Sequence, residues 1–186
     1  MLLLFFFNID FFIFFNKIIL KFKEIYLMQK VFNVQTTLLR SSGFQDHGIT
    51  ELLFKPTPLT FQISLNYNSE VINQEQGFYN VTVTISIKAF KNKATPPEQE
   101  AGDPVYTAVT SYSGIFVIKN FNKEELETVL NVNCPSIVFP YARAEINRML
   151  SETQLPKPQL QPHQFDVAYQ QKKQAEQEAK EQDGMH

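Results

Sequence analysis

The chain has 186 residues, a formal net charge of −2 and one cysteine, Cys134. This length suits one domain with a sizeable core, and the near-balanced charge gives no reason to expect nucleic acid as a partner. A lone cysteine excludes an intramolecular disulfide and is typical of a reducing compartment. Only three histidines could activate it, so we expect a buried structural thiol rather than a nucleophile.

Residues 1–27 differ in composition from the rest of the chain. The stretch 2–20 is nearly long enough to cross a bilayer, but Asp10 and Lys17 interrupt it. An aspartate at the centre of a bilayer costs roughly 2.5–3.5 kcal/mol on insertion scales. The stretch lacks Gly, Ala, Pro, Arg, Ser, Thr and Val, as translated AT-rich leader DNA would. We therefore expect a non-native leader before a true start at Met28, with a membrane anchor as the alternative.

Four stretches are predicted to be strands: 31–40, 59–67, 78–90 and 105–119. The middle two alternate apolar and polar side chains cleanly, which indicates a sheet with one apolar and one polar face, and hence antiparallel pairing. Residues 41–58 are predicted to be a long connection whose centre, 49–54, is apolar enough to pack. Residues 91–104 contain three prolines and are predicted to be a solvated loop.

Helices are predicted after the strands. Asn122 and Glu125 have the spacing of a capping box, which predicts a short helix over 122–131. The dense apolar stretch 133–149 contains two prolines. Because proline is tolerated in the first turn of a helix but not in its interior, we predict a turn over 135–139 and a helix from Pro140 to about Ser151.

The C-terminal part is predicted to be a crossover and a last helix. Residues 153–162 carry three prolines and are expected to be extended, and a helix is expected to begin at Pro162 or His163. Beyond Gln170 the chain is rich in Gln, Lys, Glu and Ala. Residues 171–186 are therefore expected to be a polar, disordered tail.

These elements predict an α+β fold in which a four-stranded antiparallel sheet is covered by a helix. The fourth strand is apolar on both faces toward its end, so one copy has more apolar surface than it can bury, which favours self-association. The sequence shows no phosphate loop, no metal-binding spacing of His or Cys, and no nucleophile elbow. We therefore expect no enzyme activity, cofactor or metal, and we interpret Asp46, Glu51 and Asp103 as solvated loop residues.

Three motifs, in order, resemble the SecB family of bacterial export chaperones. They are SGIFVI at 113–118, CPSIVFPYARAEI at 134–146 and PQLQPHQFDVAY at 158–169. The resemblance covers about residues 32–169 and implies a chaperone domain over 28–170. It further implies a cytoplasmic homotetramer, built as a dimer of dimers with the long helices between two sheets, that holds unfolded precursor proteins for export.

The resemblance also implies a groove that binds extended apolar client segments, between the sheet, the crossover and the last helix. Carried over by position, its lining is Phe54, Leu59, Phe61, Ile63, Leu155, Leu160, Phe165, Ala168 and Tyr169. The alternative is that these residues form ordinary core. On the long helix, the resemblance implies a core or oligomer role for Cys134, Ile137, Phe139, Tyr141, Ile146 and Met149.

The chain departs from the family where the SecA motor docks. That dock relies on acidic residues of the outer sheet face, whereas residues 105–113 contain no carboxylate and Arg40 ends the first predicted strand. Binding to SecA is therefore less well supported than client holding. A second hypothesis remains: an interaction module on the same fold that serves one partner, such as a toxin–antitoxin pair or a membrane-tethered assembly.

Overall fold

The computed structural model describes residue 17 and residues 29–91, 103–153 and 155–183. Apart from Lys17, the leader predicted over 1–27 lies outside these residues, as does the loop 92–102. The described chain begins with strand β1 (Val31–Asp46), the short helix α2 (Ile49–Phe54), and strands β2 (Leu59–Asn73), β3 (Phe78–Lys91) and β4 (Tyr106–Lys119). Helix α3 (Lys123–Thr128), a π-helical turn (Val129–Asn133), and helices α4 (Cys134–Glu152) and α5 (Phe165–Asp183) follow.

The four strands form one sheet in the order β1-β4-β3-β2, and every neighbouring pair is antiparallel. The predicted four-stranded antiparallel sheet with helices after it is therefore confirmed. Strands β2, β3 and β4 follow one another as neighbours, whereas β1 lies at the far edge beside β4. In the described chain, β1 and β2 are thus the two free edges of the sheet.

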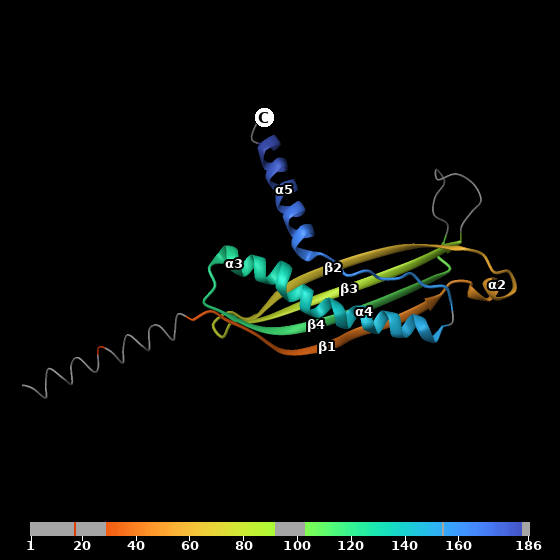
Figure 1. Cartoon of the computed structure of the whole chain (residues 1–186), viewed down its shortest axis with the longest axis horizontal. Helices are drawn as coiled ribbons and strands as arrows, with labels where there is room; N and C mark the ends of the chain where they lie inside the picture. Colours follow the sequence, from red (N-terminus) through yellow and green to blue (C-terminus); the bar gives the residue numbers. More distant parts are fainter. Residues whose placement is uncertain (1–16, 18–28, 92–102, 154, 184–186) are drawn as a thin grey trace, which may run out of the picture.

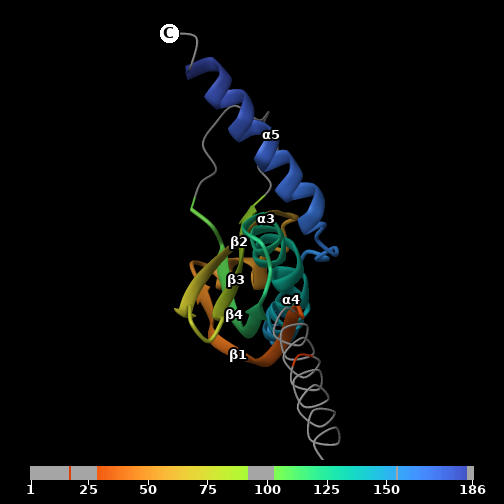
Figure 2. The same cartoon turned by 90° about the vertical axis from the view of Figure 1, so that its left-hand side faces the viewer.

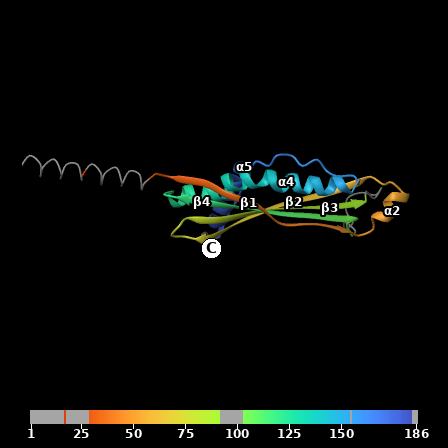
Figure 3. The same ribbon diagram turned by 90° about the horizontal axis from the view of Figure 1, so that it is seen from below.

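One face of the sheet is covered and the other is open. Alternate residues of β3, such as Val81, Val83 and Ile87, are fully buried beneath α4, and their β4 partners lie on the same face. Figures 1 and 3 show α4 running along this face, with no described helix across the opposite one. On the open face, hydroxyl pairs join β3 to β4: Thr82 to Ser113 at 2.7 Å and Thr84 to Ser111 at 2.8 Å.

Strand β1 is longer than predicted. We expected it to end at Arg40, but it continues to Asp46. Pairing with β4 persists through two irregularities in register, between Val34 and Thr36 and between Leu39 and Ser41. Each bulge inserts a residue and changes which side chains face the helix. The first bulge moves the helix-facing positions to Thr37 and Leu39, and the second returns them to Ser42 and Phe44, which packs on Tyr106 with ring centroids 5.3 Å apart.

The β2–β3 turn depends on Gly77. Its φ of +68° lies in the left-handed region, which disfavours other residues. Its carbonyl accepts a 2.9 Å hydrogen bond from the Ile118 amide. A Cβ at this position would lie 2.5 Å from the Ile118 carbonyl oxygen, so the close approach of β4 also excludes a side chain.

The predicted start of the long helix was wrong. The chain is helical from Lys123 to Glu152, and Pro140 lies inside α4. The capping box at Asn122 is confirmed: its side chain accepts a 2.8 Å hydrogen bond from the Glu125 amide. Pro140 is exposed, and so is Ser136, the residue whose carbonyl loses its helical donor. Solvent can hydrate that carbonyl, so a proline on the outer side of the helix is tolerated.

Helix α5 also differs from the expectation. The stretch 171–186 was predicted to be disordered, but α5 continues to Asp183 and projects away from the sheet (Figures 1 and 2). Polar side chains surround most of it. Pairs such as Lys172 and Glu176, four residues apart and 4.0 Å from each other, support a solvated helix of this kind.

Candidate functional site

The helix-facing side of β2 carries an incompletely covered row of apolar side chains. Leu59, Phe61 and Ile63 share this face because they pair with the buried side of β3. Leu59 and Phe61 are partly buried against the core, whereas Ile63 is 45% exposed. Phe54, at the end of α2, is 82% exposed. The structure thus leaves apolar surface exposed on β2 and at the end of α2, where the family resemblance implies a groove.

The crossover between α4 and α5 runs back along α4 (Figure 1). The buried Tyr106 hydroxyl donates a 2.8 Å hydrogen bond to the Pro156 carbonyl, which fixes the crossover to the sheet. Burial raises the pKa of Tyr106 to about 12, so the hydroxyl keeps its donor proton at physiological pH. Leu155 and Leu160 pack against the core from this segment and remain partly exposed.

The first turns of the last helix, α5, are packed into the core, whereas a groove lining would have to be exposed. Phe165 is 1% exposed and Tyr169 is 3% exposed, while Ala168 is partly buried. The Phe165 ring meets the edges or faces of three others, with centroid distances of 5.5 Å to Tyr67, 5.8 Å to Phe139 and 4.6 Å to His163. The single chain therefore does not present Phe165 and Tyr169 to a client. In this conformation Phe165 packs the start of α5 against Tyr67 of β2 and Phe139 of α4.

Residues of α4 divide between core and surface. Cys134, Phe139 and Ile146 are buried against the sheet, while Ile137 and Met149 are partly buried. Tyr141 is 47% exposed and stacks on Tyr112 of β4 at 5.7 Å. Near β1, Phe32, Val34 and Leu39 are also exposed. The apolar surface that a second copy could cover therefore lies between Tyr141 and the β1 edge.

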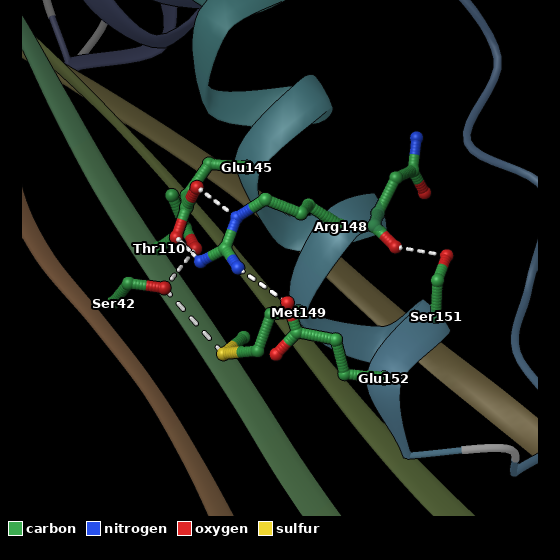
Figure 4. Close-up of polar contacts among 8 residues, drawn as sticks. Ser42, Thr110, Glu145, Arg148, Met149, Ser151 and Glu152 are labelled. Atoms are coloured by element: carbon green, nitrogen blue, oxygen red, sulfur yellow. Dashed lines mark hydrogen bonds and ion pairs between the residues drawn. The ribbon is translucent and has the colours of Figure 1, made fainter.

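A polar cluster that the sequence analysis did not identify joins α4 to β1 (Figure 4). Arg148 donates to Glu145 at 2.8 and 3.0 Å and to Glu152 at 2.6 Å. Ser42 lies 3.4 Å from both the Thr110 hydroxyl and the Met149 sulfur. The hydrogen bond from Arg148 lowers the pKa of Glu145. Spacings of three and four residues could have suggested the Arg148 pairs, but the position of Ser42 depends on the β1 bulges.

Metal-binding clusters and the single thiol were the remaining chemical features to locate among the described residues. They contain no group of three or more His, Cys, Asp or Glu side chains that could hold a metal ion. Cys134 is fully buried, and burial raises its pKa to about 12, which disfavours the reactive thiolate. Within the same ranges, no helix combines the length and apolar character needed to cross a membrane.

Exposed apolar side chains on β1, on β2 and at the end of α2 are typical of a surface that contacts other proteins. The profile of the family described as preprotein translocase subunit SecB matches residues 27–176. The chain belongs to the SecB family of protein-export chaperones.

Named relatives agree with this assignment. A protein-export protein SecB of Alcanivorax borkumensis is 27% identical over 150 residues, which cover 80% of this chain and 90% of that protein. One from Methylobacillus flagellatus is 30% identical over 118 residues, covering 63% and 69%. The Mycobacterium tuberculosis SecB-like chaperone Rv1957, solved with a ChAD peptide from the antitoxin HigA1, has a TM-score of 0.53 at 14% identity. That match covers 70% of this chain and 88% of Rv1957, and it shows a shared fold.

Proposed function

We propose that this protein holds unfolded precursor proteins in the cytoplasm, in a form competent for export, by binding extended apolar segments in the groove. Membership of the SecB family supports the export role. The observation that carries the groove is the exposure of apolar side chains, Ile63 on β2 and Phe54 at the end of α2, in a fold whose crossover is fixed to the sheet by Tyr106. Burying client side chains there contributes about 25 cal/mol per Å².

The groove that we propose has an open part and a supporting part. Phe54, Leu59, Phe61, Ile63, Leu155 and Leu160 form the open part, which a client contacts. Phe165, Ala168 and Tyr169 form a wall that holds the crossover and α5 in place. Because the described β2 edge has no strand beside it, a client can also pair with its backbone there.

We propose further that the protein is a homotetramer arranged as a dimer of dimers. The exposed apolar residues near β1, together with Tyr141 on α4, support contacts between copies. Phe32, Val34 and Leu39 lie on the helix-facing side of β1, and Tyr141 stacks on Tyr112 of the adjacent β4, so this surface is at the side of the sheet away from β2. Assembly through this region would therefore leave the groove open.

Docking of SecA remains outside this proposal. The outward side chains of β4 between Thr107 and Ser113 are Thr107, Val109, Ser111 and Ser113, none of which is acidic. They form a surface rich in hydroxyl groups, whereas the family's docking surface for SecA is acidic.

Two surface substitutions test the groove. Ile63→Ser should weaken capture of a denatured client, whereas Val71→Ser should not. Both side chains lie on the same face of β2 and are exposed, 45% and 58% respectively. Position 71 lies eight residues further along the strand, about 26 Å away. Equal suppression of client aggregation by both variants and the unaltered protein would refute the groove.

A pull-down from cells tests the breadth of binding. A varied set of unfolded precursors supports a general holding role. A single stoichiometric protein would instead favour the dedicated interaction module.

A further inference from the structure

The hydroxyl of Tyr106, at the start of β4, makes a contact between the sheet and the crossover. The Tyr106 side chain is fully buried, and its hydroxyl donates a 2.8 Å hydrogen bond to the Pro156 carbonyl. Pro156 directly follows Leu155, which belongs to the open part of the proposed groove. A buried group of the sheet is therefore hydrogen-bonded to the backbone beside a residue that we expect to contact clients.

The sheet holds this hydroxyl in a fixed position. The ring of Tyr106 packs on Phe44 of β1, with centroids 5.3 Å apart, and Ala89 of β3 is its cross-strand partner. One residue earlier, the Val105 amide donates to the Ala89 carbonyl at 2.7 Å, and the Val105 carbonyl accepts from the His47 amide at 2.8 Å. Because the ring is packed and the backbone is bonded on both sides, the Tyr106 hydroxyl has little freedom to move.

The crossover is stiff around the bonded carbonyl. Proline fixes its own φ and disfavours the helical conformation in the residue before it, and prolines stand at 156 and 158. On the α4 side, the Leu155 amide donates to the Thr153 hydroxyl at 3.3 Å, and that hydroxyl donates to the Leu150 carbonyl at 2.8 Å. Two hydrogen bonds, to Thr153 and from Tyr106, thus hold the chain before and after the Leu155 side chain.

From these observations we propose that Tyr106 is a positioning residue for client capture: its hydroxyl holds the crossover so that Leu155 is part of the groove before a client arrives. This inference rests on the proposed client-holding function and names a determinant of its affinity. A client then binds a surface that is already ordered, whereas a freed crossover would have to be ordered on binding. Tyr106 itself is fully buried, so it acts through the crossover rather than by touching the client.

Tyr106→Phe tests the proposal because it removes the hydroxyl and keeps the ring that packs on Phe44. The probe is a reduced and carboxymethylated protein, which stays unfolded in buffer, titrated against the full chain. Its affinity should fall about threefold to tenfold, the factor expected for one hydrogen bond. Hydrogen exchange in the crossover should rise. Tyr79→Phe is the matched control and should change neither, since Tyr79 is a buried tyrosine at the opposite end of the same sheet face.

A double-mutant cycle shows whether Tyr106 acts through Leu155. Leu155→Ser alone should weaken capture, because it removes apolar surface from the groove. Adding Tyr106→Phe to Leu155→Ser should cause no further loss, since the side chain that the hydroxyl positions is then absent. A merely structural role of the hydroxyl would instead lower the affinity by the same factor in both backgrounds, and that result would refute the positioning role.

If Tyr106→Phe does not fold, Pro156→Gly carries the test. Pro156 is exposed, and glycine keeps the carbonyl acceptor while it frees the backbone on either side. Capture should weaken about twofold to fivefold, which corresponds to the added backbone freedom. An unchanged affinity would overturn the proposal.

The remaining outcomes separate this inference from the function on which it rests. Equal affinity of the unaltered chain and Tyr106→Phe refutes the positioning role and leaves client holding intact. A lower affinity without faster exchange in the crossover also refutes it, because the hydroxyl then acts elsewhere. If the unaltered chain does not bind the unfolded probe, the proposed function fails, and the inference fails with it.

Discussion

Replacing Phe165 with alanine should destabilise the protein rather than only weaken its binding. The side chain is 1% exposed and packs in a cluster with Tyr67, Phe139 and His163. Burial of this kind makes Phe→Ala cost about 3–5 kcal/mol, and the loss of aromatic pairs contributes to that figure. A native domain has only about 5–15 kcal/mol of stability, so this loss is a large share.

Thermal melting at fixed protein concentration measures the effect. For a domain of this size, a loss of about 3–5 kcal/mol lowers the Tm by roughly 6–20 °C. Because Phe165 begins α5, amide exchange in that helix should rise first. Val167→Ala is the matched control, since Val167 lies on the same turn but is 44% exposed. An unchanged melting temperature together with lost client capture would contradict the burial of Phe165. It would indicate instead that Phe165 is exposed and contacts the client.

Further predictions concern stability, the chain start and assembly. Arg148 lowers the pKa of Glu145 in the folded state. The ionised Glu145 carboxylate therefore stabilises the fold fully above its unfolded-state pKa, and this stabilisation is lost as the pH falls through its folded-state pKa. Chemical unfolding should therefore show a smaller acid-induced loss of stability in Glu145→Gln, and equal losses would contradict this. Gly77→Ala should cost at least about 1–3 kcal/mol, whereas Gly43→Ala, where nothing lies within 4 Å of the added carbon, should cost far less. Mass spectrometry of the cellular protein should find an N-terminus at or near Met28, and peptides from 1–27 would refute the misplaced start. Light scattering should give four times the chain mass, and a monodisperse monomer at micromolar concentration would exclude the tetramer.

Local patterns predicted much of the sheet. Strict alternation located β2 and β3 because each has one buried face, and the spacing of Asn122 and Glu125 located the start of α3. Alternation did not predict the last six residues of β1, because SSGFQD has one apolar side chain and is rich in residues typical of loops, whereas pairing with β4 continues to Asp46. The sequence wrongly predicted that the long helix begins at Pro140. A proline inside a helix is tolerated when it lies on the solvent-facing side, and the sequence pattern did not show which side that is.

The candidate site was less predictable, since exposure depends on tertiary packing. Ile63 and Phe165 are both apolar residues of amphipathic elements, yet one is 45% exposed and the other 1%. The difference arises because Tyr67 and Phe139, far apart in the sequence, meet Phe165 in space. The crossover likewise runs back along α4, and no periodic pattern in the sequence predicts that path.

Titration calorimetry with one client in two states tests the central claim most directly. The protein should bind the client when it is held unfolded, with a negative heat-capacity change from buried apolar surface. It should not bind the same client once folded, because the apolar segments are then inside. Equal binding to both states, or no binding to the unfolded one, would contradict the account.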